Sequence, residues 1–465
     1  SPFTVTDLGT LGGPGTKAMG TNDGGDVVGA SQTGTYLHGF TWAAGTMTDL
    51  GDLGGQGSWA YDVNAVGQVV GGSPLGSGDN HAFLWQNGGM QDLGTLGGPT
   101  SYAFEINDAG QAVGYACCAP DTYLSHAVLW GSGGIVDLGD LDLQWPAISA
   151  AYGLNDAGQV VGGSYDASAN FHAFLWQNGG MQDLGTLGGD YSSAEAINED
   201  GEVVGTARLA NSTPHAFLWQ NGAMQDLGSP GWDQSIGYDI NDDGMVVGVL
   251  QTGPASHAFL WADGQMQDLN NLIPTGSGWE LQEARAISNR GRIAGFGTFG
   301  GQTRAFLLEP RAYRWINPAG GVWSTSSNWD PQGVPGAGDR VIFALAGQYS
   351  IDTTSFAPVA GEAPAVVTEA DGLLVEGTNT VDFHSLNLNI LSDSPADPGL
   401  QVGSEGIVNI HSGSGTFVHG ALGVLPSTAP NPARLQVFNS GTTLTGTGGL
   451  LIGDEGPGDL FVANG

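Results

Sequence analysis

Lysine is almost absent from this chain of 465 residues. Lys17 is the only one, and the 10 basic residues face 46 acidic ones, for a formal net charge of −36. Such a field repels phosphate backbones and anionic lipid surfaces, which argues against nucleic acid and membrane surfaces as partners. It suits an extracellular protein that stays soluble through self-repulsion or collects cations such as Ca²⁺; a polar surface with few lysines is the simpler interpretation.

Cysteine is equally scarce, with Cys117 and Cys118 adjacent to each other and no third one. Two neighbours provide neither a disulfide framework nor a zinc-binding spacing. In an oxidising compartment the pair is a candidate for a vicinal disulfide, although such a ring is strained. Two free thiols in a loop are the alternative.

Long apolar runs are also missing, since no stretch of about 18 apolar residues occurs and no transmembrane helix is expected. The sequence opens on Ser1-Pro2-Phe3 without a signal peptide, which is the beginning expected of an exported protein after processing.

Glycine, in contrast, is abundant at 81 residues, without the G-X-Y period of collagen and with 40% hydrophobic residues to build cores. Glycine that punctuates short Val, Ile, Leu and Phe runs predicts many short strands joined by tight turns.

A repeat of about 44 residues organises the first two thirds of the chain. Its most recognisable element occurs seven times, 42 to 47 residues apart, as HGFTW (38–42), HAFLW (81–85), HAVLW (126–130), HAFLW (172–176, 215–219 and 257–261) and RAFLL (304–308). This period is typical of the four-stranded blade of a β-propeller.

Each repeat divides into four strand-length pieces, exemplified by AYDVN (60–64), GQVVGGS (67–73), HAFLWQ (81–86) and GMQDLG (89–94). Asn or Ser followed three residues later by Gly separates the first two pieces, as in Asn64 to Gly67. That spacing predicts a type I turn closed by a glycine with positive φ.

The ends of the repeat region complement each other. The seventh repeat stops at RAFLLEP without a DLG strand, whereas FTVTDLGTLGG (3–13) precedes the first repeat as an unmatched fourth strand. Pairing the two would seal a ring without an exposed edge. The sequence therefore predicts a seven-bladed β-propeller over residues 1–310, closed by its N-terminal strand.

These segments resemble the bacterial extracellular HAF-repeat family, because HAFLW, DLGTLGG and INDxGxVVG recur together over about residues 3–310. The resemblance implies export and a repeat architecture, and it assigns no reaction.

The residues that recur in every repeat are expected to be scaffold. The His of each HAF element, replaced by Arg304 in the seventh repeat, is predicted to bond a turn or carboxylate of its own blade, and the Asp of each DLG to order the fourth-strand turn. The six repeated Trp residues are expected to pack between blades. No G-x-S-x-G, HExxH or P-loop motif accompanies them, so we expect a protein that is not an enzyme.

Residues that depart from the repeat are better candidates for function. Aromatic side chains in the loops of one propeller face could stack on sugars or grip a protein, or else cap the core between blades. They are Tyr36, Trp59, Tyr102, Tyr123, Trp145, Tyr165, Tyr191, Trp232 and Trp279. Acidic residues at Asp137, Asp140 and Asp142 are candidate Ca²⁺ ligands, without the spacing of an EF-hand.

After Pro310 the period vanishes. Residues 313–343 resemble the opening segment of autotransporter-like and PEP-CTERM-associated surface proteins, on Trp315, Gly320, Gly321, Trp323, Asn328, Trp329, Pro335, Gly338 and Asp339. The short apolar runs that follow, from LLVEG to LFVANG, predict the rungs of a β-solenoid over residues 311–465, with a β-sandwich as the alternative. No cap follows LFVANG, so we expect the domain to continue beyond Gly465 or to be covered by another subunit.

Together these features predict a secreted, cell-surface structural or adhesive protein, with the propeller as binding or assembly head and the solenoid as stalk or polymerisation element. Its partners would be a protein or glycan at the cell surface, or further copies of itself. The alternative is a carbohydrate-binding or carbohydrate-active module that uses the aromatic loops. No cofactor is expected other than Ca²⁺.

Overall fold

A computed structural model describes residues 1–118, 124–141, 148–262 and 264–315 without a break, and short strands and turns beyond residue 315. Side chains are described as far as Arg311 and again in residues 325–328. The chain divides into two compact units, essentially Phe3–Glu309 and Pro310–Gly465.

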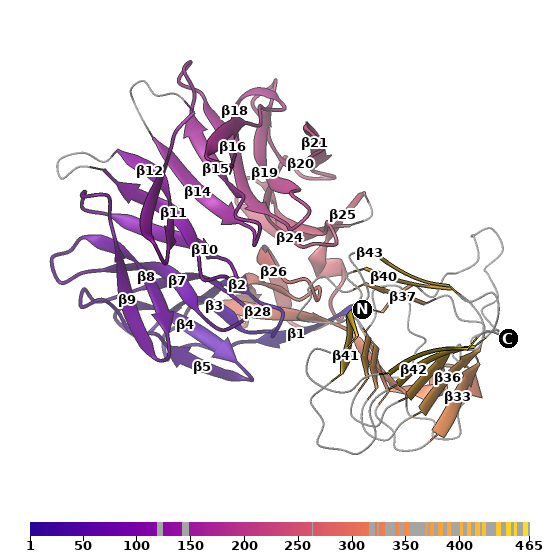
Figure 1. The fold of residues 1–465 in the computed structure, drawn as a ribbon. Helices are drawn as coiled ribbons and strands as arrows, with labels where there is room; N and C mark the ends of the chain where they lie inside the picture. The colour runs from indigo at the N-terminus through magenta and orange to yellow at the C-terminus, as the bar shows by residue number, and fades with distance from the viewer. Residues whose placement is uncertain are drawn as a thin grey trace. The chain divides into compact units, whose positions relative to one another are not determined.

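Groups of four antiparallel strands make up the first unit (Figure 1). In chain order the complete groups are β2 (Thr16–Thr21), β3 (Val27–Gln32), β4 (Leu37–Ala43) and β5 (Thr46–Asp49); β6 (Trp59–Val63), β7 (Val69–Pro74), β8 (Asn80–Gln86) and β9 (Gly89–Gly94); β10 (Ser101–Ile106), β11 (Ala112–Cys117), β12 (Ser125–Gly131) and β13 (Gly134–Gly139); β14 (Ser149–Leu154), β15 (Val160–Tyr165), β16 (Phe171–Gln177) and β17 (Gly180–Asp183); β18 (Gly188–Ile197), β19 (Val203–Leu209), β20 (Pro214–Gln220) and β21 (Ala223–Gly228); and β22 (Gln234–Ile240), β23 (Val246–Thr252), β24 (Ala255–Ala262) and β25 (Gln265–Asp268). The last group contains β26 (Trp279–Ile287), β27 (Ile293–Phe299) and β28 (Gln302–Pro310).

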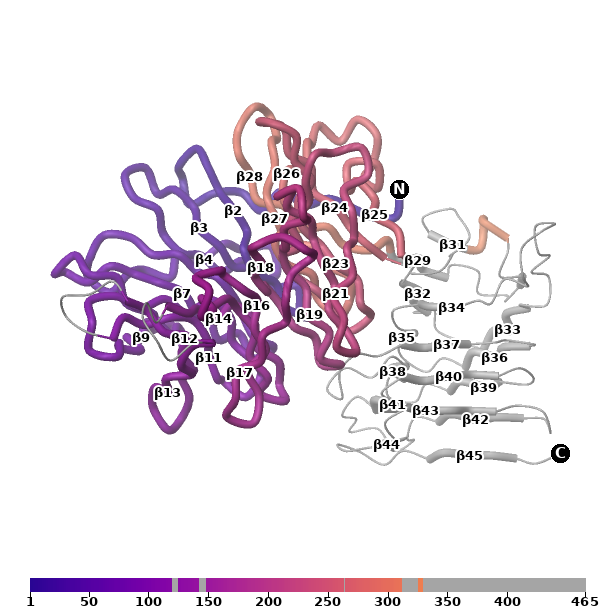
Figure 2. Tube along the Cα trace, turned by 90° about the horizontal axis from the view of Figure 1, so that it is seen from above, coloured from indigo at the N-terminus to yellow at the C-terminus, as the bar shows by residue number. Residues whose placement is uncertain are grey.

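The first strand of each group lies against the first strand of the next. These inner strands contact one another in the order β2, β6, β10, β14, β18, β22 and β26, and β26 contacts β2 again. Figure 2 shows the return of the chain, with β26, β27 and β28 beside β2 and β3. Four-stranded sheets around a common axis form a β-propeller.

The last sheet is completed from the other end of the chain. β1 (Phe3–Asp7) pairs with β28, so that the strand order is β26, β27, β28 and β1, and the two lie side by side in Figure 1. The backbone N–H of Leu8 donates to the carbonyl oxygen of Ala305 over 3.1 Å. The structure thus contains the pairing predicted between the unmatched N-terminal strand and the last repeat.

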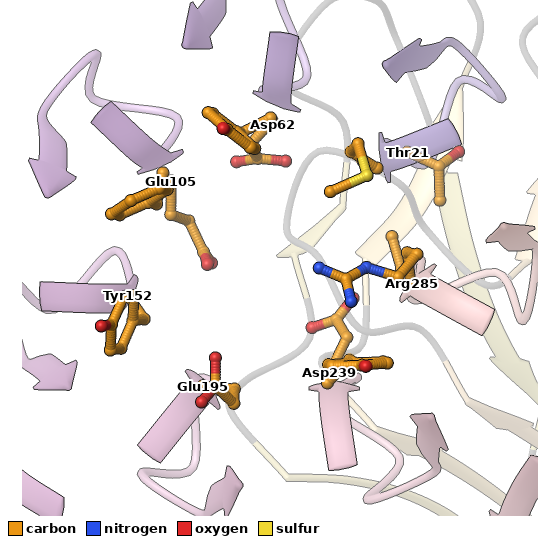
Figure 3. Close-up of a pocket in the computed structure, with 13 residues that line it drawn as sticks. Thr21, Asp62, Glu105, Tyr152, Glu195, Asp239 and Arg285 are labelled. Atoms are coloured by element: carbon orange, nitrogen blue, oxygen red, sulfur yellow. The ribbon is translucent and has the colours of Figure 1, made fainter. Parts of the chain in front are cut away.

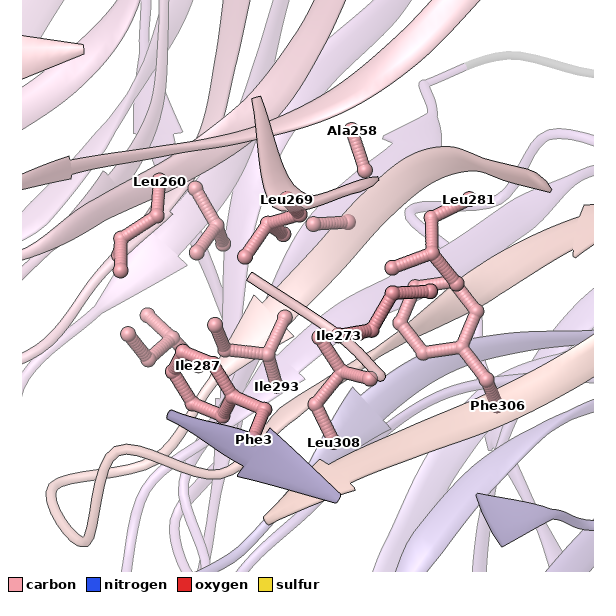
Figure 4. Packing of buried hydrophobic residues seen from close by; sticks show 12 residues of the cluster. Phe3, Ala258, Leu260, Leu269, Ile273, Leu281, Ile287, Ile293, Phe306 and Leu308 are labelled. Atoms are coloured by element: carbon pink, nitrogen blue, oxygen red, sulfur yellow. The ribbon is translucent and has the colours of Figure 1, made fainter. Parts of the chain in front are cut away.

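The junction of β1 with β28 is called the seam below. An apolar cluster fixes β1 there (Figure 4). Phe3 keeps only 8% of its surface exposed and packs in one cluster with Leu269, Ile287, Ile293 and Leu308, among others. Burial of an aromatic side chain of this size contributes about 2 to 3 kcal/mol of transfer free energy.

The turn predicted between the first two strands is confirmed. In every repeat the Gly N–H bonds back to the Asn or Ser carbonyl, and each Gly has a positive φ, such as 79° at Gly67. The Asn side chain does more than the sequence suggests. Asn64 Oδ1 accepts from the N–H of Gln68, while its Nδ2 donates to the carbonyl oxygen of Asn107 in the next sheet.

The same link is repeated between neighbouring sheets. The buried donors and their acceptors are Asn22 to Asn64, Asn64 to Asn107, Asn107 to Asn155, Asn155 to Asn198, Asn198 to Asn241 and Asn241 to Ser288. At the seam Arg292 donates to the carbonyl oxygen of Asp23 instead. Side-chain hydrogen bonds therefore join each sheet to the next around the ring.

The repeated histidines are structural, as predicted. The Nδ1 atom of each lies 2.6 to 3.0 Å from the Asp carboxylate of its own sheet, in the pairs His38–Asp49, His81–Asp92, His126–Asp137, His172–Asp183, His215–Asp226 and His257–Asp268. At the seam Arg304 bonds Asp7 of β1 over 2.8 Å. Each Asp also accepts the N–H two residues later, which orders the turn after the strand.

The second unit consists of short strands in three sheets. The first sheet contains β31 (Trp329–Asp330), β29 (Ala312–Trp315), β32 (Arg340–Phe343), β35 (Leu373–Val375), β38 (Leu400–Val402), β41 (Ala421–Val424) and β44 (Leu451–Ile452); the second contains β30 (Gly321–Val322), β33 (Gln348–Asp352), β36 (Thr380–His384), β39 (Ile407–Ile410), β42 (Arg434–Phe438) and β45 (Asp459–Ala463); the third contains β34 (Thr368–Ala370), β37 (Leu388–Leu391), β40 (Ser414–Val418) and β43 (Thr443–Thr447). Among these described strands all pairs are parallel except β29–β31.

Helix is confined, in the described part of the chain, to the 3-10 turns η1 (Leu269–Asn271) and η2 (Ser326–Asn328). No helix there has the length and apolar character needed to cross a bilayer.

The seam gives a first testable prediction. Phe3→Ala should lower the free energy of unfolding by about 3 kcal/mol, because a buried aromatic ring is removed and a cavity remains. Amide hydrogen exchange should accelerate first in β28, the partner of β1. Thr4→Ala removes an exposed side chain from the same strand and should change stability by less than about 0.5 kcal/mol. Equal effects of the two substitutions would contradict the packing described for Phe3.

Candidate functional site

A β-bulge interrupts every inner strand at the same place. The pairing between the first and second strands of each sheet skips one residue, for example between Ala60 and Asp62 on β6 and between Ala103 and Glu105 on β10. The skipped residues are Met19, Tyr61, Phe104, Tyr152, Glu195, Tyr238 and Arg285. A bulge bends its strand and re-aims side chains, and bulges are frequent beside binding sites.

The glycine of each VVG element makes room for this bulge. A Cβ atom at Gly114 would overlap the carbonyl oxygen of Tyr102, and one at Gly71 would overlap that of Trp59. The corresponding glycines of the other repeats, Gly29, Gly162, Gly205, Gly248 and Gly295, face an inner-strand carbonyl in the same way. The glycine is thus required by the close approach of the bulged strand.

The bulged residues and those next to them line one cavity on the propeller axis, with a volume of about 240 Å³. Figure 3 shows its labelled side chains around the opening, with Glu105 and Glu195 directed towards the centre and the guanidinium of Arg285 opposite them. All the inner strands contribute, through Met19, Gly20, Thr21, Tyr61, Asp62, Phe104, Glu105, Tyr152, Glu195, Tyr238, Asp239, Arg285 and Ala286.

Burial raises the pKa of the cavity carboxyl groups. Desolvation raises the pKa of Asp62 from 3.8 to about 6, although the N–H of Ile106 donates to it over 3.0 Å. Desolvation likewise raises the pKa of Asp239 to about 7, against hydrogen bonds from Ile240 and Ile287 (2.8 and 2.7 Å). Both carboxyl groups therefore hold protons at pH values where an exposed aspartate has lost its own.

The pKa values of the two cavity glutamates are also raised, for partly different reasons. Burial and then the charges of Asp62 and Asp239 raise the pKa of Glu105 well above its ordinary value. Burial also raises the pKa of Glu195, while a hydrogen bond from Ser193 (2.9 Å) and the charge of Arg285 oppose the shift.

Arg285 is the one basic side chain among the residues that line this cavity. Its guanidinium carbon lies 3.8 Å from the centre of the Tyr238 ring, and its Nη1 atom lies 3.3 Å from Oε2 of Glu283. The cavity thus already contains one cation stacked on an aromatic face.

A second pocket, of about 350 Å³, is lined by aromatic residues: Trp59, Tyr61, Tyr102, Phe104 and Tyr115. Tyr61 and Phe104 belong to both pockets and meet edge to face, with their ring centres 5.1 Å apart. Burial raises the pKa values of Tyr61 and Tyr115 to about 12, so these hydroxyls stay neutral at physiological pH.

Of the aromatic residues proposed from the sequence, the structure brings Trp59 and Tyr102 together in this aromatic pocket. The other described ones are dispersed. Tyr36 is 41% exposed, Tyr165 and Tyr191 flank Phe171, Trp232 packs on His257, and Trp279 stacks on Phe299. Tyr123 and Trp145 lie outside the described residues. The predicted set is therefore not one continuous rim in the described part of the chain.

The described residues do not assemble the predicted Ca²⁺ site. Asp137 is bonded to His126 and to the N–H of Gly139, and Asp140 lies 3.9 Å from Nε2 of His126. Asp142 lies outside the described residues. Among those described, no group of three or more His, Cys, Asp or Glu side chains is arranged to hold a metal ion.

The vicinal disulfide is not formed in the structure, where both cysteines are free thiols. Cys117 is buried and its Sγ lies 2.9 Å from Oγ1 of Thr100, whereas Cys118 is partly exposed and directs its Sγ to the carbonyl oxygen of Ala116 at 3.8 Å. Of the two alternatives, the structure has the free thiols, but Cys117 is the last residue of β11 and does not lie in a loop.

The axial residues were not identified from the sequence, apart from the aromatic pair that borders them. A signal for them exists in the five residues before each turn. In six of the seven repeats these segments have a small first residue, an apolar fourth one and a final Asn or Ser. They are AYDVN, AFEIN, AYGLN, AEAIN, GYDIN and ARAIS. Their second position varies from Tyr to Glu to Arg, and this is the residue that the bulge turns towards the axis.

Comparison with known proteins assigns the chain to no family. No family model and no curated protein matches it. Among solved structures it is similar to the β-propeller domain of the Trilobed protease from Pyrococcus furiosus (9% identity, TM-score 0.43, 63% of this chain and 93% of that one). It is also similar to TolB from Acinetobacter baumannii (12%, 0.37, 66% and 80%) and to YCF48 bound to D1 peptide (12%, 0.37, 67% and 95%). These values carry no inference about function.

The glycine that faces a bulge provides a test of the site's construction. Gly114→Ala should destabilise the propeller by about 3 kcal/mol, because the new methyl group cannot be accommodated without moving the carbonyl of Tyr102. Gly133→Ala, in the hairpin of the same sheet, has no atom within 4 Å of the new Cβ and should cost less than about 0.5 kcal/mol. Denaturant unfolding of both variants measures the difference; equal stabilities would contradict the bulge.

The raised carboxyl pKa values predict a pH dependence of stability. Between about pH 4 and 7 the folded protein keeps a proton on Asp239 that the unfolded chain releases, so its contribution to stability falls as the pH rises. Asp239→Asn should remove up to about 4 kcal/mol of this fall. Asp200→Asn, in an exposed turn, should change this dependence far less. The measurement is the free energy of unfolding of the wild type and both variants at half-unit pH intervals. If all three proteins show the same dependence on pH, the raised pKa of Asp239 is refuted.

Proposed function

We propose that this chain is a non-enzymatic, extracellular or cell-surface binding and structural protein. In this proposal residues 1–310 form a seven-bladed β-propeller that binds a ligand at its axis. Residues 311–465 form a β-solenoid that serves as stalk or polymerisation element.

One observation carries the proposal, namely that repeats with nearly identical scaffolds differ where they face the axial cavity. The bulge position is Tyr61 in one sheet, Glu195 in another and Arg285 in a third. The flanking strands meanwhile repeat the same HAFLW and VVG elements. A position that only supported the fold would carry the same residue in each repeat, so the unlike lining indicates recognition of an asymmetric ligand.

The pKa values of the cavity acids all shift in the same direction, and this favours binding over catalysis. General acid–base chemistry uses two carboxyl groups whose environments push their pKa values apart. Here burial moves the pKa values of Asp62, Glu105, Glu195 and Asp239 in the same direction. The repeated His and Asp side chains are engaged in the pairs that order each sheet and are not part of this cavity.

The number of blades and the nature of the second domain rest on the strand pairing. Seven inner strands follow one another in contact, and β1 completes the last sheet. Beyond Pro310, strands three apart in the chain pair in parallel, as in β33, β36 and β39. This pairing supports a three-sided solenoid, in which each turn stacks on the one before it.

An extracellular location agrees with the resemblance to the HAF-repeat family and with the large negative charge, which favours solubility.

Thermal unfolding in the presence of a chemically diverse panel of small ligands tests the proposed function. At least one ligand should raise the Tm of the full chain and have no effect on Tyr61→Ala, because Tyr61 lines both pockets. Tyr36→Ala, on an exposed loop, should respond like the wild type. Mass spectrometry should recover the ligand unchanged; turnover of the ligand, or shifts that persist in Tyr61→Ala, would contradict the proposal.

Carbohydrate binding is a second candidate, favoured by the aromatic pocket at Trp59 and Tyr102. Sugars present apolar faces to aromatic rings, and a pocket of about 350 Å³ accommodates a single pyranose ring. If this pocket is the binding site, glycan-array signals should be lost in Trp59→Ala and retained in Tyr36→Ala. Signals equal in both variants would dismiss the candidate.

A further inference from the structure

The axial cavity combines four carboxyl groups with a single guanidinium, and the carboxyl group of Asp239 lies beside that guanidinium in Figure 3. Glu105 and Glu195 point towards the centre from one side in Figure 3, and Arg285 does so from the other. Arg285 is itself held by Glu283 at 3.3 Å and by the ring of Tyr238, so its charge is shared with a carboxylate outside the lining. The lining therefore carries an excess of acidic groups.

Other basic side chains of the propeller contact groups outside this cavity. Lys17 lies 4.1 Å from the centre of the Phe296 ring, Arg208 pairs with Asp190, and Arg304 pairs with Asp7. The polar partners of Asp62 are the backbone N–H groups of Ile106 and Val63, and that of Glu105 is the backbone N–H of Leu154, so no basic side chain is among them. A bound cation would therefore be the group that favours the ionised forms of these two carboxyl groups.

The remaining walls are aromatic. Phe104 lies between Tyr61 and Tyr152, with ring centres 5.1 and 5.4 Å away. Aromatic faces attract organic cations and tolerate their alkyl parts, whereas a strongly hydrated metal ion gains little from them. Acidic groups beside a set of rings thus form an environment for an ammonium or guanidinium group on a carbon skeleton.

We propose that the axial cavity binds a small organic cation, such as an alkylammonium or guanidinium compound, between the carboxyl groups of Glu105 and Glu195 and the rings of Tyr61, Phe104 and Tyr152. This inference rests on the proposed function and specifies its ligand class. The volume of about 240 Å³ equals roughly eight water molecules, which accommodates a short amine but no polymer segment.

Isothermal titration of the full chain with two isosteric probes tests the proposal. We expect 1,5-diaminopentane to bind and pentane-1,5-diol, which has the same length without charge, to bind at least about tenfold more weakly. Glu105→Gln keeps the shape of the side chain and should reduce diamine affinity by about tenfold or more. Asp200→Asn, which removes the same charge from an exposed turn, is the matched control and should have no effect.

Proton release gives a second readout that needs no variant. The titratable groups that face the cavity are Asp62, Glu105, Glu195, Asp239, Tyr61, Tyr152, Tyr238 and Arg285. A bound cation favours the ionised carboxylates, so diamine binding near pH 6.5 should release protons and tighten as the pH rises to about 7.5. Titrations in buffers of different ionisation enthalpy measure the number of protons released.

The outcomes separate this inference from the proposed function. If the diol or a neutral sugar binds as well as the diamine and loses affinity in Tyr61→Ala, the cavity binds ligands but the cationic class is wrong. If Ca²⁺ binds in place of the diamine, the organic class is wrong. Diamine binding that is unchanged in Glu105→Gln, or absent at millimolar concentration, also overturns the inference.

Discussion

The structure depends on the pairing of β1 with β28. Without it the last sheet would have three strands and an open edge, and the ring would have to close through side-chain contacts alone. Two arginines of the seventh repeat, at positions where the other repeats have different residues, reinforce the seam. Arg304 takes the place of the repeated His and reaches Asp7, and Arg292 supplies the bond to the next turn that Asn provides elsewhere. The longer Arg side chains thus join segments from opposite ends of the repeat region.

Closure of the ring gives the axial cavity its shape. The inner strands touch in a circle, so a residue that leaves the ladder at a bulge is directed towards the axis. The glycine of VVG admits the bulge, and the linked Asn side chains join neighbouring sheets. A repeated and symmetrical scaffold thereby presents a lining in which Tyr61, Glu195 and Arg285 occupy equivalent places. The scaffold residues are interchangeable between repeats, whereas the residues in the lining are not.

The sequence predicted what is encoded locally. The strand pieces, the Asn-to-Gly turns and the His–Asp pairs depend on residues within one repeat, and the missing fourth strand could be located by comparing the two ends. The bulges could not be predicted, because they depend on the close approach of the second strand to the inner strand, which arises only when both are paired. Tyr61 and Glu105 were therefore overlooked, while Trp59 and Tyr102 beside them were recognised as aromatic departures. The other described aromatic residues of the predicted set do not join them, because residues such as Trp279 pack against their own sheet.

Strand complementation tests whether β1 closes the ring. Residues 1–8 are deleted from the full chain, and amide hydrogen exchange is followed by mass spectrometry with and without a peptide of residues 1–12. If β1 closes the ring, exchange should become faster in β26, β27 and β28 after the deletion, and protection should return when the peptide is added. Unchanged exchange in the deletion variant, or a peptide that restores nothing, would contradict this closure.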